Sequence, residues 1–390
     1  MSGEDRGASS RAQQRDLRAT ELVLSDSFAG TEGHVALLSR GLAALGVKVR
    51  LVCGDRNTRL IDEMRDSGVD VRPLRLGKGN LPVDWRAAYR AIVGWNPHIV
   101  HAQLGSSLLC GAVLTWRGER LIFTQQFVRP AYLNATGPGA VVRALGHRLA
   151  HGRVAYGIAT TQLVRSEMIK REGFAKDQTT VIPLAIDAEH ILTQARTDSS
   201  DVRTELVLPH DASLLIAPAR LEREKDHHTL LACLPRVLAR HPNTYLLLAG
   251  SGALESALRE QAHHLDIMSH VRFLGQRADV PRLLLQGTLC VLPSYEEPFG
   301  LVLLEAMAVA TPVVACNAGG PRDIVIDGET GLLVSPRDAG AMAQAVIAIL
   351  TDRDRARAMG VAGRERVQRH FSARQMATRT LQEYRRVIAG

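Results

Sequence analysis

Short apolar runs alternate with segments of helical periodicity along most of the chain. In the first half, runs of strand length lie at 22–24, 47–53, 69–74, 99–101, 121–123, 157–159 and 180–182. A second series lies at 214–217, 245–249, 271–274, 289–292, 312–315 and 331–334. Between these runs, segments such as 32–45 have the spacing of a helix. The alternation predicts an α/β protein with two parallel sheets, each covered by helices.

A polar, weakly periodic stretch at 183–210 separates the two series. Since 390 residues exceed the usual size of a single domain, we expect two. We place a Rossmann-like N-terminal domain at 19–190, a Rossmann-like C-terminal domain at 191–370 and a terminal helix at 371–390. Residues 1–18 are polar and lack the apolar core of a signal peptide, so we expect a disordered tail there.

The formal net charge of +8 suggests an anionic partner, which would be a nucleic acid, a membrane surface or a small substrate. No aromatic-basic RNA motif, zinc-finger spacing or dense basic block is present, which argues against a nucleic acid. The five cysteines form no C-x-x-C pair, as expected for a reducing cytoplasm. No apolar run approaches the roughly 18 residues that a membrane span needs. We therefore expect a cytoplasmic protein that does not bind nucleic acid.

The most informative segment contains two glutamates, Glu297 and Glu305, with seven residues between them. It follows the apolar run 289–292, and a tight Pro-Phe-Gly turn at 298–300 precedes a predicted helix. Eight helical positions bring a side chain to within about 80° of its starting direction. Both carboxylates can therefore line one pocket, with Glu297 at its mouth and Glu305 deeper.

The turn itself supplies hydrogen-bond donors. Unpaired backbone N–H groups near Phe299, Gly300 and Leu301 would attract anions and hydroxyl oxygens, and the helix dipole has the favourable sign. Paired acceptors beside such donors suit a ligand that carries both hydroxyls and phosphates, such as a nucleotide sugar. The alternative is that Glu305 is a solvated helix residue and Glu297 an ordinary loop carboxylate.

The stretch 271–334 resembles the donor-binding region of retaining glycosyltransferases of family four. Besides the two glutamates, the matching pieces are Phe273-Leu274-Gly275, Leu292-Pro293-Ser294, Ala318-Gly319-Gly320 and Gly328-Glu329-Thr330-Gly331-Leu332-Leu333-Val334. The resemblance implies the GT-B fold, in which two Rossmann-like domains face a central cleft and a terminal helix returns to the first domain. It also implies transfer of a sugar from a nucleotide-diphosphate donor to an acceptor hydroxyl, with retention of configuration and without a cofactor. We expect the donor to be a UDP- or GDP-sugar.

The segment 218–226 resembles the family's G-R-L…E-K pattern, with Ala219 in place of glycine. Arg220 and Lys225 would neutralise the donor diphosphate and stabilise the charge that develops as the glycosidic bond breaks. Two such cations remove the need for a metal ion, and no D-x-D motif lies at a convincing strand end. We therefore predict that no metal is essential. The alternative is a solvated helix start at 223–226.

The resemblance also assigns roles to other residues of the second half. Glu297, with the amides at 299–301, would hold the sugar and the diphosphate. Glu305 would accept hydrogen bonds from the ribose hydroxyls. Arg277 follows a strand at the place where such enzymes hold the base, so it is a candidate base contact.

In the first half, Gly30 and Thr31 lie in a stretch that resembles the family's glycine-containing phosphate loop. Their amides could donate to the diphosphate or to the acceptor, although a tight turn without a ligand would look the same. The family usually has a histidine near the reacting sugar where this chain has Gln126, which cannot take a proton at neutral pH. The acceptor-side candidates are His34, His101, Gln126, Phe127, Arg129 and Tyr132.

The stretch 141–153 is basic and amphipathic. It fits an anionic membrane surface beside a lipid-linked acceptor, and a solvated helix face is the alternative. Peripheral contact with the inner face of the cell membrane is therefore a second hypothesis for the location. The acceptor stays open among glycans, lipid-linked intermediates and small molecules.

Two other functions fit parts of this pattern. A catalytically weak, sugar-nucleotide-binding subunit of a partner transferase is suggested by Gln126 and by Thr288, which stands where the family often has aspartate. A GT-B epimerase or phosphorylase is the second. A phosphorylase would need a lysine that binds pyridoxal phosphate, and none of the five lysines has an obvious context for it.

Overall fold

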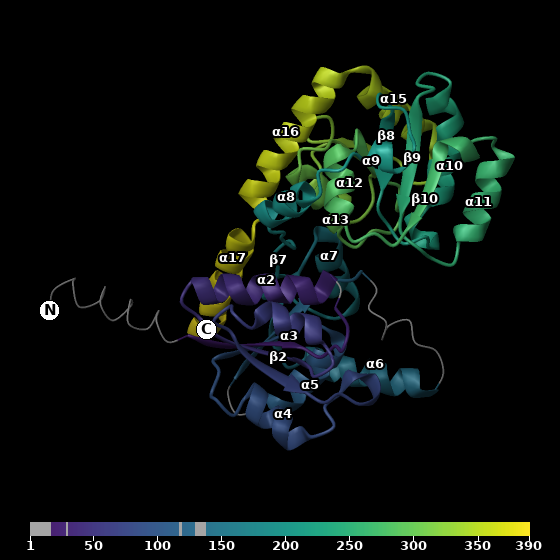
Figure 1. Ribbon diagram of the computed structural model, residues 1–390. Coiled ribbons are helices and arrows are strands. Elements are labelled where there is room, and N and C mark those ends of the chain that lie inside the picture. The colour runs from purple at the N-terminus through teal and green to yellow at the C-terminus, as the bar shows by residue number, and fades with distance from the viewer. Residues whose placement is uncertain (1–16, 29, 117–118, 129–137) are drawn as a thin grey trace. The chain divides into compact units, whose positions relative to one another are not determined.

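The computed structural model describes residues 17–28, 30–116, 119–128 and 138–390. The chain divides into two compact units. The N-terminal unit takes in the residues up to Ala185 together with Ala373–Gly390, and the C-terminal unit is Ile186–Ser372. In each unit, helices surround a central layer of strands (Figure 1).

The N-terminal unit has a seven-stranded parallel sheet with the order β3-β2-β1-β4-β5-β6-β7. The strands are β1 (Arg18–Val23), β2 (Lys48–Gly54), β3 (Asp70–Leu74), β4 (Ile99–Ala102), β5 (Arg120–Gln125), β6 (Val154–Ala159) and β7 (Thr179–Val181). Leu22 of β1 pairs with Val52 on one side and Ala102 on the other, and all three are buried. Strands covered on both faces in this way read as continuous apolar runs, which is why the sequence predicted them.

The helices of this unit are α2 (Gly30–Ala44), α3 (Thr58–Met64), α4 (Trp85–Ile92), α5 (Gly105–Leu114), α6 (Pro138–His151), α7 (Gln162–Arg171) and α17 (Ala373–Ala389). Two single turns of 3-10 helix, η1 (Lys78–Asn80) and η3 (Lys176–Gln178), lie in the connections. One buried cluster includes residues of α2, α3 and α17, and a second includes residues of α4, α5, α6 and α7. The two clusters correspond to the two faces of the sheet.

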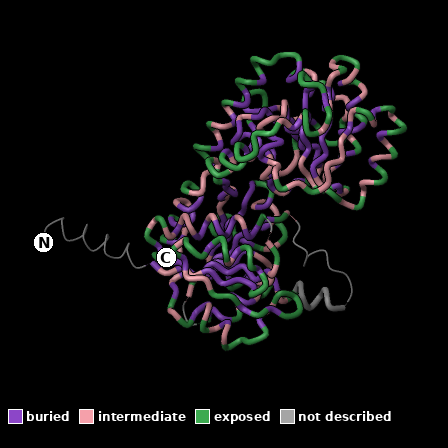
Figure 2. Tube along the Cα trace, in the orientation of Figure 1, coloured by how far each residue is buried: buried purple, intermediate pink, exposed green. Residues whose placement is uncertain are grey.

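The C-terminal unit has a six-stranded parallel sheet with the order β10-β9-β8-β11-β12-β13. The strands are β8 (Ser213–Ala217), β9 (Thr244–Ala249), β10 (Val271–Gly275), β11 (Leu289–Leu292), β12 (Val313–Cys316) and β13 (Leu332–Val334). The strand order reverses between β8 and β11, and ligands of open parallel sheets bind at such a switch point. Figure 2 shows buried residues along the strands and exposed residues on the outer helices of both units.

The longer helices of this unit are α8 (Ala188–Thr197), α10 (His227–Leu238), α11 (Glu255–His264), α12 (Val280–Gln286), α13 (Leu301–Ala308), α15 (Ala339–Thr351) and α16 (Arg353–His370). The short ones are α9 (Val202–Glu205), η4 (Arg223–Lys225), η5 (Met268–His270) and α14 (Pro321–Ile324). Side-chain hydrogen bonds cap the N-termini of several of these helices. For example, the Asp338 carboxylate accepts a hydrogen bond from the Ala341 amide at 2.8 Å at the start of α15.

The structure differs from the sequence-based organisation at two places. Leu17 is buried and β1 begins at Arg18, so ordered chain starts inside the segment expected as tail. The polar stretch 183–210 contains two helices, α8 and α9. The final helix, α17, belongs to the N-terminal unit, as the resemblance implied, and packs on α2, where a Cβ on Gly41 would lie 2.7 Å from the Ala377 Cβ.

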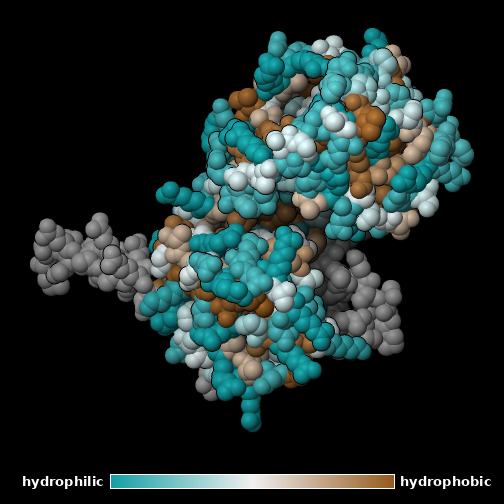
Figure 3. Space-filling view, in the orientation of Figure 1, coloured by the Kyte–Doolittle hydropathy of each residue, from teal (hydrophilic) through white to brown (hydrophobic). Residues whose placement is uncertain are grey.

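The parallel sheets and covering helices confirm the predicted α/β class with two Rossmann-like units. No helix in the described part of the chain combines the length and the apolar character needed to cross a bilayer. Figure 3 shows a mainly hydrophilic surface with scattered apolar residues on the visible face.

Candidate functional site

Lys225 and Glu297 meet at the switch point of the C-terminal sheet. Lys225 ends η4, which follows β8, and Glu297 lies in the loop that follows β11. The Lys225 Nζ atom is 2.6 Å from Glu297 Oε2, and both side chains are largely buried. A backbone hydrogen bond from Tyr295 N to Glu224 O, at 3.2 Å, joins the two loops. The sequence predicted both residues in one pocket, and the structure brings them into direct contact.

Arg220 lies between β8 and η4 and is mostly exposed. Its side chain is 68% exposed, and its guanidinium donates to Glu224 Oε1 at 2.8 Å. Exposed ion pairs of this kind contribute little to stability, so an anionic ligand can replace the glutamate at small cost. Arg220 therefore remains available to a diphosphate.

The start of α13 presents the backbone donors that the sequence predicted. Gly300 precedes the helix with φ at 99°, a left-handed conformation that favours glycine. Among the described residues, no acceptor is bonded to the N–H groups of Phe299, Gly300 or Leu301. Three unpaired amides at the positive end of a helix make an anion-binding position.

Two glycines hold the Glu297 loop close to the next connection. A Cβ on Gly319 would lie 2.1 Å from Glu297 O, and one on Gly320 would lie 2.2 Å from Phe299 O. The Gly320 amide donates to Glu297 O at 2.9 Å. Any side chain at either position would push the loop away, so these glycines position Glu297 and the start of α13.

Glu305 lies in the second turn of α13. Burial raises the pKa of its carboxyl above the ordinary value, and no described residue forms a hydrogen bond or an ion pair with it. The Ser294 hydroxyl, just after β11, is also buried without a partner. Ser294 was not among the predicted site residues, although its position at a strand end, in a piece that matches the family, was a usable signal. Phe299 is buried and packs edge-on against Phe371, with ring centroids 6.5 Å apart.

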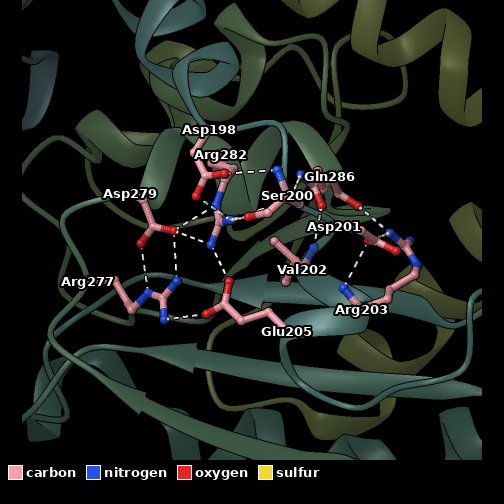
Figure 4. A network of polar contacts seen from close by, with 10 residues as sticks. All are labelled: Asp198, Ser200, Asp201, Val202, Arg203, Glu205, Arg277, Asp279, Arg282 and Gln286. Atoms are coloured by element: carbon pink, nitrogen blue, oxygen red, sulfur yellow. Dashed lines mark hydrogen bonds and ion pairs between the residues drawn. The ribbon is translucent and has the colours of Figure 1, made fainter.

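Arg277 is engaged in a structural network instead of pointing freely from its strand end. Its guanidinium donates to Asp279 at 2.7 and 2.8 Å and to Glu205 at 2.9 Å (Figure 4). The neighbouring Arg282 bonds to the same two carboxylates and to Asp198. All three guanidinium nitrogens of Arg277 are therefore occupied, which leaves the backbone of this loop as the better candidate for a base contact.

In the N-terminal unit, Gly30 begins α2 and Thr31 follows in its first turn. The Thr31 hydroxyl donates to Gln126 Oε1 at 3.0 Å, and Gln126 Nε2 is buried without a described partner. Both ring nitrogens of His34 are also buried and unpaired, and burial lowers the pKa of His34 to about 4. At neutral pH the His34 ring is therefore uncharged, and the side-chain amide of Gln126 has an N–H donor without a described partner.

His101 is not available to an acceptor, contrary to the sequence-based expectation. It is fully buried in β4, where its ring nitrogens lie 2.6 Å from the Tyr384 hydroxyl and 2.6 Å from the Thr124 hydroxyl. Its Nδ1 also lies 3.3 Å from Glu21. Burial would raise the pKa of Glu21, but His101, Tyr384 and Gln103 outweigh that effect and lower it.

Of the remaining acceptor-side candidates, Phe127 is 46% exposed, and Arg129 and Tyr132 lie outside the described residues. Within the described ranges, no group of three or more His, Cys, Asp or Glu side chains is arranged to hold a metal ion.

Comparison with known proteins identifies the family of the chain. The family described as Glycosyltransferase Family 4 matches residues 28–190, and Glycosyl transferases group 1 matches 198–366. D-inositol 3-phosphate glycosyltransferase of Frankia alni is 30% identical over 353 residues, which cover 82% of this chain and 86% of that protein. The chain belongs to glycosyltransferase family 4.

Other relatives of this family 4 member match it in part or by fold. Glycogen synthase of Mycobacterium tuberculosis is 40% identical over 172 residues, which span 44% of this chain and 42% of that protein's length. The crystal structure of Anabaena HepE in complex with UDP superposes with a TM-score of 0.76 at 20% identity, and the match covers 94% of this chain and 99% of that one. This likeness supports the GT-B fold.

Proposed function

We propose that this family 4 member is a retaining glycosyltransferase that moves a sugar from a nucleotide-diphosphate donor to an acceptor hydroxyl. The observation that carries the proposal is the contact between Lys225 and Glu297 beside the unpaired amides at the start of α13. A cation, a carboxylate and free N–H groups at a switch point match the phosphates and hydroxyls of such a donor. The central cleft implied by the resemblance stays a prediction.

In this proposal the donor diphosphate lies between Arg220, Lys225 and the α13 amides. The Lys225 ammonium group binds a phosphate oxygen in place of part of its contact with Glu297. The Glu297 carboxylate can then accept a hydrogen bond from a sugar hydroxyl. Glu305, which has no described partner, accepts from the ribose hydroxyls. The base lies against the backbone that follows β10. UDP and GDP are the expected nucleotides, and the UDP complex of HepE agrees with the first.

The reaction breaks the bond between the anomeric carbon and the diphosphate oxygen and forms a bond from that carbon to the acceptor oxygen. Arg220 and Lys225 stabilise the negative charge on the leaving diphosphate, in the manner of other preorganised cations. The same diphosphate oxygen takes the acceptor proton, because Gln126 cannot. Attack from the leaving-group side retains the configuration. No metal and no cofactor take part.

The acceptor is proposed only as a hydroxyl of a glycan, a lipid-linked molecule or a small molecule. The relatives include both a glycogen synthase and a D-inositol 3-phosphate glycosyltransferase, so both a polymeric and a small acceptor are compatible with the family. We also propose a cytoplasmic enzyme that contacts the membrane surface peripherally.

A transfer assay tests the proposal. Purified protein is incubated with UDP-, GDP-, ADP- and TDP-sugars and a panel of acceptors, with and without EDTA. We expect release of one nucleoside diphosphate, unaffected by EDTA, and a product whose anomeric configuration by NMR equals that of the donor. An inverted product, or release that stops with EDTA, would contradict the retaining, metal-independent mechanism.

A further inference from the structure

The net charge of the chain is concentrated in one continuous stretch. Residues 85–166 contain nine arginines, no lysine and a single acidic residue, Glu119. This surplus of eight positive charges equals the surplus of the whole chain, so acidic and basic residues balance over the rest of the sequence. Because the positive surplus is confined to about a fifth of the chain, we look for its cause in a function of that part of the surface.

The structure places much of this stretch on one face of the N-terminal sheet. Helices α4, α5 and α6 all contribute to the buried cluster on that face. Among the arginines with exposed side chains are Arg86 and Arg90 of α4, Arg148 of α6, and Arg120 and Arg153 at neighbouring strand and helix ends. Asp84, just before α4, attracts Arg86 and Arg90. No described carboxylate forms an ion pair with Arg120, Arg148 or Arg153, so the positive charge of these three is not neutralised by a described neighbour.

The same face exposes large apolar side chains. Val113 is 60% exposed and Trp116 62% at the end of α5, and Leu145 is 57% and Leu149 67% exposed on α6. These four are a third of the large hydrophobic residues exposed in the described part of the chain. Leu145 and Leu149 are four positions apart on α6 and so lie on one side of it. Val113 is in the last turn of α5, and Trp116 follows two residues after the end of that helix.

The two pairs lie on helices that pack side by side. A Cβ on Gly146 of α6 would lie 3.8 Å from Leu109 Cδ2 of α5, and the Arg153 guanidinium donates to Thr115 O. Gly146 is thus level with Leu109. Arg153, just after α6, reaches Thr115, just after α5, so the two helices run in the same direction. Val113 and Trp116 therefore lie level with the end of α6 that contains Leu149.

We propose that the surface formed by Val113, Trp116, Leu145 and Leu149, with the arginines around it, binds an anionic lipid bilayer. Leucine and tryptophan enter the interface between head groups and acyl chains, and arginine side chains bind lipid phosphates. A nucleic acid would use the positive charge but would not need exposed leucines. An enzyme bound in this way would share the membrane surface with a lipid-linked acceptor. This consequence rests on the proposed function.

Vesicle flotation with the full-length protein tests the surface. The probes are phosphatidylcholine vesicles with and without phosphatidylglycerol. We expect the protein to float with the anionic vesicles only, and to be released by high salt because the attraction is partly electrostatic. Flotation with neither vesicle, or equally with both, would overturn the proposal.

Variants locate the contact. Leu149→Glu should lower the fraction bound by about tenfold, since it places a negative charge in the apolar contact. Val361→Glu is the matched control, because Val361 is 50% exposed on helix α16 of the other unit. Arg148→Gln, which removes one exposed charge, should cause a smaller loss. Equal losses for Leu149→Glu and Val361→Glu would contradict the assignment.

Two further measurements separate the alternatives. If size-exclusion chromatography shows a dimer that Leu149→Glu dissociates, while wild-type protein ignores vesicles, the surface is a contact between copies of the chain and the proposal is wrong. The thermal shift caused by nucleoside diphosphates should be the same in wild type and Leu149→Glu. Loss of vesicle binding with an unchanged nucleotide response supports the surface independently of the proposed transfer reaction.

Discussion

At the scale of single residues, the central feature is a lysine held by a glutamate. Without a ligand, Lys225 and Glu297 neutralise each other at 2.6 Å. In the proposed function, a diphosphate competes with Glu297 for the lysine, and a sugar hydroxyl takes the place of the lysine at the carboxylate. The contact satisfies two buried charges in the absence of a ligand, and the proposed donor would satisfy both once it is bound.

Removing either partner should abolish most of the activity. Under the proposed function, Lys225→Ala removes a cation from the leaving diphosphate. Glu297→Ala removes the acceptor of the sugar hydroxyl and leaves Lys225 without its carboxylate partner. We expect kcat to fall by about 10³-fold in each variant, the scale known for loss of one preorganised donor. Lys176→Ala, in an exposed turn of the other unit, is the control. Near-wild-type turnover in Lys225→Ala or Glu297→Ala would rule out the assigned roles.

Glu305 should lower the stability of the nucleotide-free protein while it supports binding. Its raised pKa means that the folded state holds a proton more tightly than the unfolded chain, so stability falls as pH rises from the unfolded to the folded pKa. Glu305→Gln removes this loss and should raise the Tm at neutral pH by roughly 2 °C. The same change should weaken nucleotide binding by about tenfold, since a neutral amide is a poorer acceptor for the ribose hydroxyls.

Calorimetric titration and thermal unfolding measure the two effects in one variant. Glu296→Gln is the control, because Glu296 is an exposed carboxylate in the same loop. A nucleotide affinity of Glu305→Gln equal to that of wild type would show that Glu305 does not contact the ribose.

At the scale of elements, the ion network between the α8–α9 connection and α12 fixes the start of the C-terminal unit. Arg282 of α12 is 3% exposed and pairs with Asp198, Glu205 and Asp279. Three carboxylates from two chain segments thus converge on one buried guanidinium (Figure 4). Such a network specifies how these elements pack.

Arg282→Met should destabilise the C-terminal unit by roughly 3 kcal/mol, because it leaves the carboxylates without their shared cation. Chemical unfolding measures this. Arg369→Met is the matched control: the Arg369–Glu365 pair is exposed on α16, and its loss should cost less than about 1 kcal/mol. Similar destabilisation by both changes would contradict a stabilising role for the network.

The sequence predicted those elements whose causes are local. The strands were visible because each is a buried apolar run, and the start of α13 was visible because Pro298, Phe299 and Gly300 specify a turn. The hydrogen bonds of the Arg277 side chain were not predictable, since one of its partners, Glu205, is 72 positions away. His101 looked accessible for the same reason, because its partner Tyr384 is 283 positions away on α17. Long-range partners leave no local pattern.

At the scale of the whole molecule, buried histidines make the fold sensitive to acid. Burial is the main cause that lowers the pKa of His34, His147, His151 and His227 to about 4. The unfolded chain binds protons at these positions near pH 6.5, whereas the folded protein does not. Stability should therefore be complete above about pH 6.5 and fall as pH decreases toward 4, by on the order of 1 kcal/mol per histidine at pH 5.

Thermal unfolding between pH 7.5 and pH 5 measures this dependence. His227→Leu should reduce the acid sensitivity, and His210→Leu should not, because the His210 side chain is 88% exposed. A Tm that is constant or rises on acidification would show that these histidines are protonated in the folded protein.

The most direct test of the central claim is thermal unfolding of wild type and Lys225→Ala with UDP, GDP, ADP and TDP. If Lys225, Glu297 and the α13 amides form a donor site, one nucleotide in excess should raise the wild-type Tm by several degrees, since a ligand that binds only the folded state stabilises it. The same nucleotide should leave Lys225→Ala almost unchanged. No shift with any of the four nucleotides, or an equal shift in both proteins, would contradict the account.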